Sequence, residues 1–481
     1  MAMNAPTGVT AETLAAVAAA LASPGAVTAS DAVLAKASTQ GISTTTGLTG
    51  YLLEGPAKNL FPVLSPLRNR FTRHPAPIGA TAVNWKAITA INAAKVKAGV
   101  GEGLRNSVVT TTEVDKSATF KDFGLDDKVT FRAIDAGRGF EDVRAMSTAN
   151  LLSAVMVEEE KLILGGNTSA IGAPASTTHV DTATAGSLTA ATTYDYAVSA
   201  LTLYGYLNGA TGRGAADAPD ESGPRTGSHT TGAGKTAFAI TWPAVRGAVA
   251  YNVYIGTSGG TKYYVATTTV PTYEFTALVG SGNTVNSADQ TADALSFDGV
   301  IPQISASGAG AYWKDLAAAT LTGDNAGGIV EIDAMLQTLW DNSRISPTIL
   351  TVNSQQAKDM LAKVAANGST TTLRLTAAVD ASGVIRGGLR LGSYLNKFTG
   401  SDVEVFTHPY QAPGTILALS EHLPYPNNNV PNPFELEVLR EYTQYDWALV
   451  ARQYEFGVYA TECLKVYFPA GCGVITGIKA G

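Results

Sequence analysis

Charged residues are scarce in this chain of 481 residues: 15% are Asp, Glu, Lys or Arg, against about a quarter in ordinary soluble domains. Much of the surface can therefore be covered without removing charges from water, which indicates contacts between subunits. The net charge is -7, and no block of Lys and Arg stands out in the sequence. These features argue against a protein that recognises DNA or RNA by sequence.

Cysteine and histidine are also rare. Cys463 and Cys472 lack CxxC spacing, so we expect two free thiols in a protein made in a reducing cytoplasm, with a local disulfide as the alternative. The five histidines are scattered and show no zinc-binding spacing: His74, His179, His229, His408 and His422. We therefore expect no metal site.

Long hydrophobic runs are absent as well. No run reaches the roughly 18 apolar residues that a membrane-spanning helix needs, so we expect no membrane association. The apolar run 14–22 is mostly alanine, follows Glu12 and has no basic residues before it. This pattern predicts a short helix and not an export signal.

Two short motifs imitate enzyme sites. GAGKT (232–236) has the end of a phosphate-binding loop, but His229 occupies the place of the first glycine, and FAITW after it alternates like a strand. GTSGG (256–260) matches G-x-S-x-G, yet strand-like sequence on both sides predicts a hairpin turn. We therefore expect no catalytic, cofactor or metal residues, and a protein that is not an enzyme.

The first part of the chain predicts an extended arm, a loop and a helix. Residues 1–80 include five prolines between positions 56 and 77, which block regular helix and leave apolar anchors such as Leu67 for a neighbour. Residues 81–132 read as two strands around a polar, glycine-containing tip. Within 133–180, residues 140–164 predict one long helix that is ended by two glycines.

The long helix has its own pattern. Glu141 and Asp142 fall in its predicted first turn, and an apolar stripe follows: Val143, Met146, Leu152, Val155, Met156, Leu162 and Ile163. Three adjacent carboxylates, 158–160, splay by about 100° per residue on a helix. They predict a turn that faces solvent or an interface, and not an acid/base pair.

The second part begins with a change of composition. Residues 181–292 are rich in Thr, Ala, Gly and Tyr, and short alternating runs such as TYDYAVSALTLYG and YNVYIG predict an inserted β-sandwich. In 293–410, the spacing of residues 332–340 predicts a helix, and SPTILTVNSQQAKDML predicts a strand, a turn and a helix. Residues 411–481 are β-rich. The fold class is therefore α+β, with one mixed domain interrupted by a sandwich.

In order and character, these segments resemble the major capsid proteins of tailed bacteriophages, with the Hong Kong 97-type fold that encapsulin shells also use. The matching phrases are LLEGPAKNLFPVLSPLRNR, AGVGEG with TTTEVDKSATFKDFGLDDKVTF, VEEEKLILGGN, GIVEIDAMLQTLWDNSRISPTILTVNSQQAKDML and YEFGVYATECLKVYFPAGCGVITGI. They cover 40–180 and 297–481. The insert itself resembles fibronectin type III or other immunoglobulin-like modules through ITWPAVRGAVAYNVY and TYDYAVSAL, in reversed order.

The resemblance implies a role for each segment. The N-terminal arm (1–80) would lie across a neighbour, and the extended loop (81–132) would reach over the adjacent subunit. The spine helix (133–180) and C-terminal strands (411–481) would form the peripheral domain, and 293–410 the axial domain. The residues implied at assembly interfaces are Leu60, Phe61, Leu64, Arg68, Arg70, Lys95, Lys97, Glu102, Arg105, Glu158 and Glu159.

The resemblance also implies a function. Pentamers and hexamers would form the icosahedral head of the virion around double-stranded DNA, bound without sequence specificity and assembled in the bacterial cytoplasm. A portal, a separate scaffolding protein and a decoration protein are the implied partners. No motif marks an Asn partner for Lys95 or Lys97 in a cross-link. An encapsulin-like compartment, a tail or surface-layer protein, and an enzyme with a convergent polar pocket remain alternatives.

Overall fold

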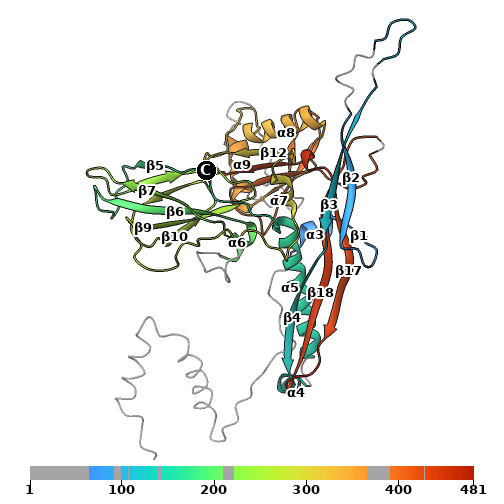
Figure 1. Ribbon diagram of the computed structural model, residues 1–481, viewed down its shortest axis with the longest axis horizontal. Helices are drawn as coiled ribbons and strands as arrows, with labels where there is room; N and C mark the ends of the chain where they lie inside the picture. Colours follow the sequence, from blue (N-terminus) through green and yellow to red (C-terminus); the bar gives the residue numbers. More distant parts are fainter. Residues whose placement is uncertain are drawn as a thin grey trace, which may run out of the picture. The chain divides into compact units, whose positions relative to one another are not determined.

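The computed structural model describes residues 64–91, 99–106, 108–138, 142–209, 221–366, 391–426 and 428–481. Helices and strands are mixed along the chain, as the α+β prediction requires, and the strands form five sheets (Figure 1). The predicted helix at 14–22 and the candidates Leu60, Phe61, Lys95 and Lys97 lie outside the described residues.

A four-stranded sheet has the order β1-β17-β18-β4 and is covered on one face by helix α5 (Val143–Gly165) (Figure 1). Its strands are β1 (Thr72–Pro75), β17 (Phe434–Asp446), β18 (Gln453–Val466) and β4 (Lys121–Thr130). Val129, Phe456 and Val458 of the sheet pack against Leu151 and Val155 of the helix. The short helix α4 (Phe131–Gly137) connects β4 toward α5.

Helix α5 confirms the predicted long helix and corrects its first turn. Asp142 is the N-cap and not a first-turn residue: its carboxylate accepts from Arg144 N and Ala145 N, both at 3.1 Å. The helix ends before Gly166, where a Cβ would lie 2.3 Å from Phe297 O. A glycine is therefore required at this position, as the sequence pattern indicated.

The predicted apolar stripe of α5 is only partly right. Met146, Leu152 and Met156 are half-buried, whereas the buried residues of the helix are Leu151, Val155, Val157, Glu159, Glu160, Leu162, Ile163, Leu164 and Gly165. The reason is that the C-terminal half of α5 is covered on several sides, by the sheet and by helices α3 (Pro66–Arg70), α6 (Leu203–Leu207) and α7 (Val300–Ser305). A single stripe cannot describe a helix segment that is enclosed all round.

The predicted loop contains a hairpin of β2 (Ala82–Ile91) and β3 (Thr111–Thr119), paired from Ala82–Thr119 to Ile91–Thr111 (Figure 1). The returning strand is not continuous. After Phe120 the chain leaves β2, and β4 pairs with β18 instead. The predicted returning strand therefore contributes β3 to the two-stranded sheet and β4 to the four-stranded sheet.

The insert is a two-sheet β-sandwich, as predicted. One sheet has the order β10-β9-β6-β7 and the other β11-β8-β5. The strands are β5 (Thr178–Asp181), β6 (Thr193–Leu201), β7 (Arg225–Thr230), β8 (Phe238–Thr241), β9 (Ala250–Thr257), β10 (Tyr263–Thr268) and β11 (Thr272–Phe275). Side chains from both sheets, including Tyr196, Val253 and Phe275, share one core. The immunoglobulin-like topology stays a prediction.

The two motifs that resemble enzyme sites form a loop and a hairpin turn, as expected. GAGKT lies in the loop before β8, and GTSGG forms the turn of the β9–β10 hairpin. One detail of the predicted strands is wrong: the LYG end of the first run belongs to helix α6 (Leu203–Leu207), which begins because the Thr202 hydroxyl accepts from Gly205 N at 3.3 Å.

The insert is rooted in the main body of the protein. Gly299 N donates to Gly166 O at 2.7 Å, so the entering and leaving segments lie side by side. Leu201, Leu203 and Val249 of the insert pack in the same hydrophobic core as Leu162 of α5. The sandwich is therefore continuous with the core and not a module on a free tether.

A six-stranded sheet has the order β12-β19-β16-β13-β15-β14. Its strands are β12 (Tyr312–Asp315), β19 (Gly473–Thr476), β16 (Ile416–Leu419), β13 (Ile349–Val352), β15 (Asp402–Thr407) and β14 (Ser393–Leu395), with helices α7 (Val300–Ser305), α8 (Val330–Ser343), α9 (Ser354–Ala366) and the turn η2 (Pro469–Gly471). The predicted strand, turn and helix of 346–361 are confirmed by β13 and α9. The predicted border at 410 does not separate the sheets, because β16 and β19 pair with strands of 293–410.

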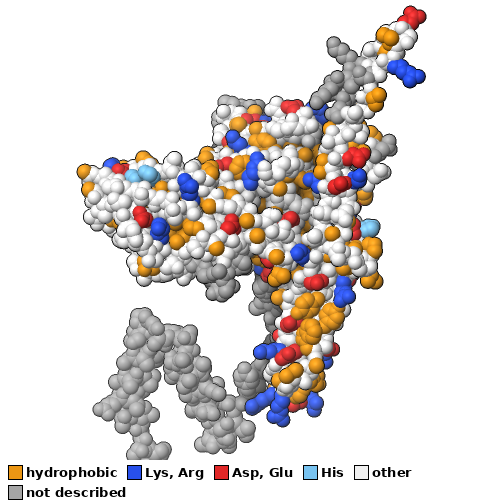
Figure 2. Space-filling model, viewed as in Figure 1, with side chains coloured by type: hydrophobic (Ala, Val, Ile, Leu, Met, Phe, Trp, Pro, Cys, Tyr) orange, Lys and Arg blue, Asp and Glu red, His pale blue; other side chains and the backbone are white. Residues whose placement is uncertain are grey.

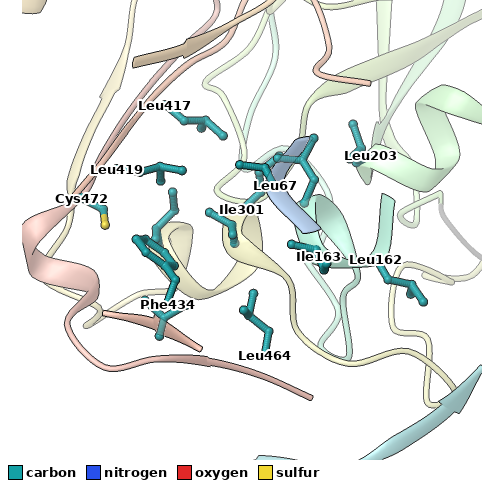
Figure 3. Close-up of a cluster of buried hydrophobic side chains, with 14 of the residues drawn as sticks. Leu67, Leu162, Ile163, Leu203, Ile301, Leu417, Leu419, Phe434, Leu464 and Cys472 are labelled. Atoms are coloured by element: carbon teal, nitrogen blue, oxygen red, sulfur yellow. The ribbon is translucent and has the colours of Figure 1, made fainter. Parts of the chain in front are cut away.

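The start of the described chain corrects the prediction for the arm. Helix α3 (Pro66–Arg70) forms despite the prolines, because Pro66 takes the first helical position, where a missing N–H costs nothing. Leu67 is 1% exposed, and Phe71 stacks on Phe434 with ring centroids 5.0 Å apart. Figure 3 shows Leu67 among Ile163, Leu203 and Ile301. Leu67 is therefore a core residue of its own chain and not an anchor for a neighbour.

Replacing Leu67 by Ala should lower the free energy of unfolding by about 3 kcal/mol, because it leaves a cavity in this core. Urea unfolding of the soluble protomer measures the change. Leu64→Ala is the matched control: Leu64 is 55% exposed, and its loss should change stability by less than about 0.5 kcal/mol. Equal effects of the two substitutions would contradict the placement of Leu67.

Candidate assembly surfaces

The β2–β3 hairpin exposes apolar side chains that the described part of its own chain does not cover. Ile88 and Ile91 are 63% and 61% exposed, and further exposed residues along the strands and tip are Val100, Leu104, Val108, Val109 and Val114. An isolated two-stranded hairpin is marginally stable in water, and a cluster of exposed apolar residues marks an interaction site. The hairpin is therefore a candidate contact surface.

Two of the predicted interface residues lie at this tip. Glu102 and Arg105 are both exposed and lie between β2 and β3 along the chain. Toward the base, Lys86 lies 3.8 Å from Glu113 and 3.9 Å from Asp115, and all three are exposed. Such pairs stabilise little in water. Near its base the hairpin is anchored through Trp85, whose ring packs edge-on against Tyr467 at 5.6 Å.

The outer face of the four-stranded sheet carries a second apolar surface. Tyr445, Trp447 and Tyr459 form a group of rings with centroids 6.1–6.3 Å apart. The ring of Tyr459 lies over Gly124, where a Cβ would come within 2.5 Å of it. Asp126 Oδ1 accepts from both Trp447 Nε1 and Tyr459 Oη, at 3.2 and 2.8 Å.

This second surface extends to the β17–β18 turn. Leu449 and Val450 are 58% and 91% exposed there, and Leu125 of β4 is 39% exposed. Figure 2 shows hydrophobic side chains gathered over this end of the sheet. No signal in the sequence singled out these residues, because a strand that faces a partner protein and one that faces a core alternate alike.

Two other candidates, Arg68 and Glu159, contact each other inside the protomer. Glu159 is fully buried and accepts from Arg68 Nε and Arg73 Nη1, both at 2.6 Å. Arg73 Nη2 also donates to Glu462 Oε2 at 2.9 Å. These residues belong to what we name the Glu159 cluster: Arg68, Arg73, Glu159, Glu160, His408 and Glu462.

Glu160 holds the start of helix α3. Its two carboxylate oxygens accept from Leu67 N at 2.9 Å and Arg68 N at 2.8 Å, in a helix whose N-cap, Ser65, makes no side-chain capping hydrogen bond. His408 Nδ1 accepts from Tyr410 N, so its proton lies on Nε2, which donates to Glu160 at 2.7 Å. The carboxylate is thus fixed by three donors in a buried position.

The prediction of a solvated or interface-facing turn at 158–160 is therefore wrong for Glu159 and Glu160, which are 0% exposed. It fits Glu158 alone, which is 37% exposed and pairs with Lys161 at 2.6 Å. Arg70 also pairs internally, with Glu421 and Glu404 at 2.5 and 2.8 Å. An assembly role for Arg68, Arg70, Glu158 and Glu159 stays a prediction.

Sequence reasoning missed four members of the cluster: Arg73, Glu160, His408 and Glu462. The ion pair of Arg73 with Glu462 spans 389 positions along the chain. No local spacing can indicate such a contact. The one available signal was the position of 158–160 near the end of a long apolar helix, where carboxylates need partners if the helix is covered.

Glu462 is a buried acid of the Glu159 cluster, and its pKa is raised. Burial raises its pKa well above the usual value of 4.5, and the neighbouring charge of Glu159 raises it further, while Arg73 opposes both. Two guanidinium groups face three buried carboxyl groups here, so one carboxyl group retains its proton more easily than in water.

The described ranges contain no group of three His, Cys, Asp or Glu side chains that could hold a metal ion. Cys463 and Cys472, both buried, are free thiols, as predicted. None of the helices in the described part of the chain combines the length and apolar character needed to cross a bilayer.

No protein-family model matches the chain, and no curated protein matches its sequence. Among solved structures it is similar to the capsid of Myoviridae phage XM1, with 8% identity, 95% of this chain and 100% of that chain covered, and a TM-score of 0.42. The capsid of cyanophage P-SCSP1u is 6% identical, with 89% of this chain and 93% of that chain covered and a TM-score of 0.39. A virus-like particle from Pyrococcus furiosus is 9% identical, with 86% of this chain and 92% of that chain covered and a TM-score of 0.33.

Glu159→Gln should lower the free energy of unfolding by about 3 kcal/mol, because two guanidinium groups lose a buried partner. The neighbouring Glu158→Gln is the control, and should cost less than about 0.5 kcal/mol since its pair with Lys161 is partly exposed. Urea unfolding at pH 7 measures both. Equal stabilities of the two variants would refute a structural role for the cluster.

Glu462→Gln should reduce the pH dependence of stability. A raised pKa means that the folded state binds this proton more tightly than the unfolded state, so its contribution is complete below about pH 4.5 and is lost as the pH rises through the folded pKa. Gln cannot titrate. From about pH 5 to 8 the variant should therefore gain stability relative to the original protein, measured by urea unfolding across this range; a constant difference would contradict the raised pKa.

Proposed function

We propose that this chain is the major capsid subunit of a tailed bacteriophage and has the Hong Kong 97-type fold. Many copies assemble into the icosahedral head that encloses the double-stranded DNA genome. One observation carries the proposal: the β2–β3 hairpin exposes Ile88 and Ile91, and the rest of the described chain covers it near its base but not at these residues. A segment of this kind is stable only when a neighbouring subunit covers it.

The surfaces suit assembly through many modest contacts. A hairpin on one copy and a different surface on the next make a heterologous contact, which closes into rings such as pentamers and hexamers when the rotation allows it. Ordering the hairpin costs conformational entropy, and burial of its apolar side chains on a neighbour offsets that cost. The protomer is then stable alone, while its hairpin becomes fully ordered in the shell.

The predicted domains acquire roles in this proposal. Residues 133–180 and the β17–β18 strands form the peripheral domain, and the six-stranded sheet with α8 and α9 forms most of the axial domain. The insert decorates the outer surface or braces neighbouring subunits, and the alternative is a tolerated insertion with no essential role. Electron microscopy maps of the shell distinguish these two roles directly, because the sandwich is large enough to appear as separate density.

The same proposal defines partners and place. A portal, a scaffolding protein and a decoration protein join the subunit in the virion, which is assembled in the bacterial cytoplasm. The packaged genome is held without sequence-specific contacts, in keeping with the net charge of -7. The role is structural and not enzymatic.

Ile91→Glu should give a folded protomer that no longer forms shells, because it places a charge in the contact that covers the hairpin. Co-expression with a scaffolding protein, followed by sedimentation velocity and electron microscopy, measures assembly. Val180→Glu is the matched control, since both side chains are 61% exposed and Val180 lies on the insert.

The experiment also separates the alternatives. Closed icosahedral shells from the original chain and from Val180→Glu, but not from Ile91→Glu, support the proposal. Normal shells from Ile91→Glu would refute the role of the hairpin. Tubes or sheets would favour a tail or surface-layer protein, and closed shells that enclose enzymes in place of DNA would favour an encapsulin-like compartment.

A further inference from the structure

A groove of about 730 Å³ lies where β3 diverges from the four-stranded sheet. On one side are residues 116–119 of β3, and on the other the end of β18, including Leu464 and Val466. Residues 167–171 at the root of the insert and Arg246 complete its walls. The contacts proposed above for shell assembly do not involve this groove.

A strand edge borders the groove, beside the face of the hairpin that carries Trp85. Four consecutive residues of β3, 116–119, line it, and side chains of consecutive strand residues point to opposite faces, so the common feature is the backbone edge. Among the described strands β3 pairs only with β2, which leaves this edge open. β18 loses its partner β4 beyond the pair Glu462–Lys121, so its last residues also present an edge.

Few backbone groups along these edges are already occupied from within the groove. Gln303 Nε2 donates to Leu464 O at 3.0 Å and takes up one acceptor of β18. An open strand edge is a template for another strand, because its N–H and C=O groups point outward at regular spacing. The groove can therefore accept an extended polypeptide alongside β3.

The charges of the groove select an acidic segment. Lys116 and Arg246 have no carboxylate partner among the described residues, and the Arg246 guanidinium is held 4.8 Å above the ring of Trp313. The one carboxylate in the wall, Asp298, accepts from Thr168 N and Thr168 Oγ1, both at 2.8 Å. Two exposed cations thus face the groove against one hydrogen-bonded acid.

We propose that this groove binds an extended acidic segment of a second protein, which adds as a strand to the free edge of β3 and places its carboxylates near Lys116 and Arg246. A nucleic acid fits less well, because its binding needs a longer basic track than two cations. A second copy of this chain fits less well too: the exposed alternating acids of its own β3, Glu113 and Asp115, already lie beside Lys86.

Fluorescence anisotropy with the full-length soluble protomer tests the proposal. The probe is a fluorescein-labelled peptide, Thr-Val-Glu-Val-Glu-Val-Thr, compared with the same peptide carrying Lys in place of Glu. The acidic peptide should bind at least tenfold more tightly, and its affinity should fall with added salt. The double variant Lys116→Glu/Arg246→Glu should reverse this preference, whereas Lys116→Arg/Arg246→Lys should preserve it. Equal affinities, or no binding of the acidic peptide, would overturn the proposal.

Hydrogen exchange tests the mode of binding without any substitution. The acidic peptide should slow amide exchange within 116–119 of the original protein, and unchanged exchange there would overturn strand addition. An oligothymidylate of equal charge that displaces the peptide would instead identify a general anion site and refute the peptide proposal. All measurements use the unassembled protomer, so their failure leaves the proposed capsid function untouched.

Discussion

Two adjacent carboxylates on α5 connect the parts of the described chain that are most distant in sequence. Glu160 receives the N-terminus of α3, and Glu159 receives Arg68 and Arg73 from the segment around β1. Glu462 joins them from β18 through Arg73. The cost of burying these charges is offset only while every partner is present, so the cluster tolerates few other arrangements of these segments. It thereby defines where the four-stranded sheet, the spine helix and the start of the described chain meet.

The described protomer has a part that is packed around the Glu159 cluster and a part, the β2–β3 hairpin, whose apolar side chains are exposed. Around the Glu159 cluster, side chains such as Leu67 and Phe71 are buried within one chain. Within the described part of the chain, the β2–β3 hairpin is supported near its base, by Trp85 and by contacts of β3 with β18, and apolar residues such as Ile88 and Ile91 are exposed. In the proposed capsid function, this contrast would suit a subunit whose rigid body sets the geometry of the shell and whose adaptable hairpin contacts the next copy.

Much of the fold was predictable where the pattern is local. The spacing of Ile332, Met335 and Leu336 predicted α8, and the alternation of β6, β8 and β9 predicted the sandwich. The failures share a cause: they depend on partners far along the chain. The break at Phe120, the burial of Glu159 and Glu160, and the outer aromatic surface each follow from which strand or arginine arrives later, and periodicity carries no such information.

The pairing of β4 with β18 has a consequence for how the protein is made. Thr130 lies opposite Gln453, so β4 emerges from the ribosome more than 300 residues before its partner. Pairing at such a separation is slow and cannot begin until residues 453–466 are available. A chain whose synthesis stops before residue 453 therefore lacks β18, the strand that joins β4 to β17 in one sheet.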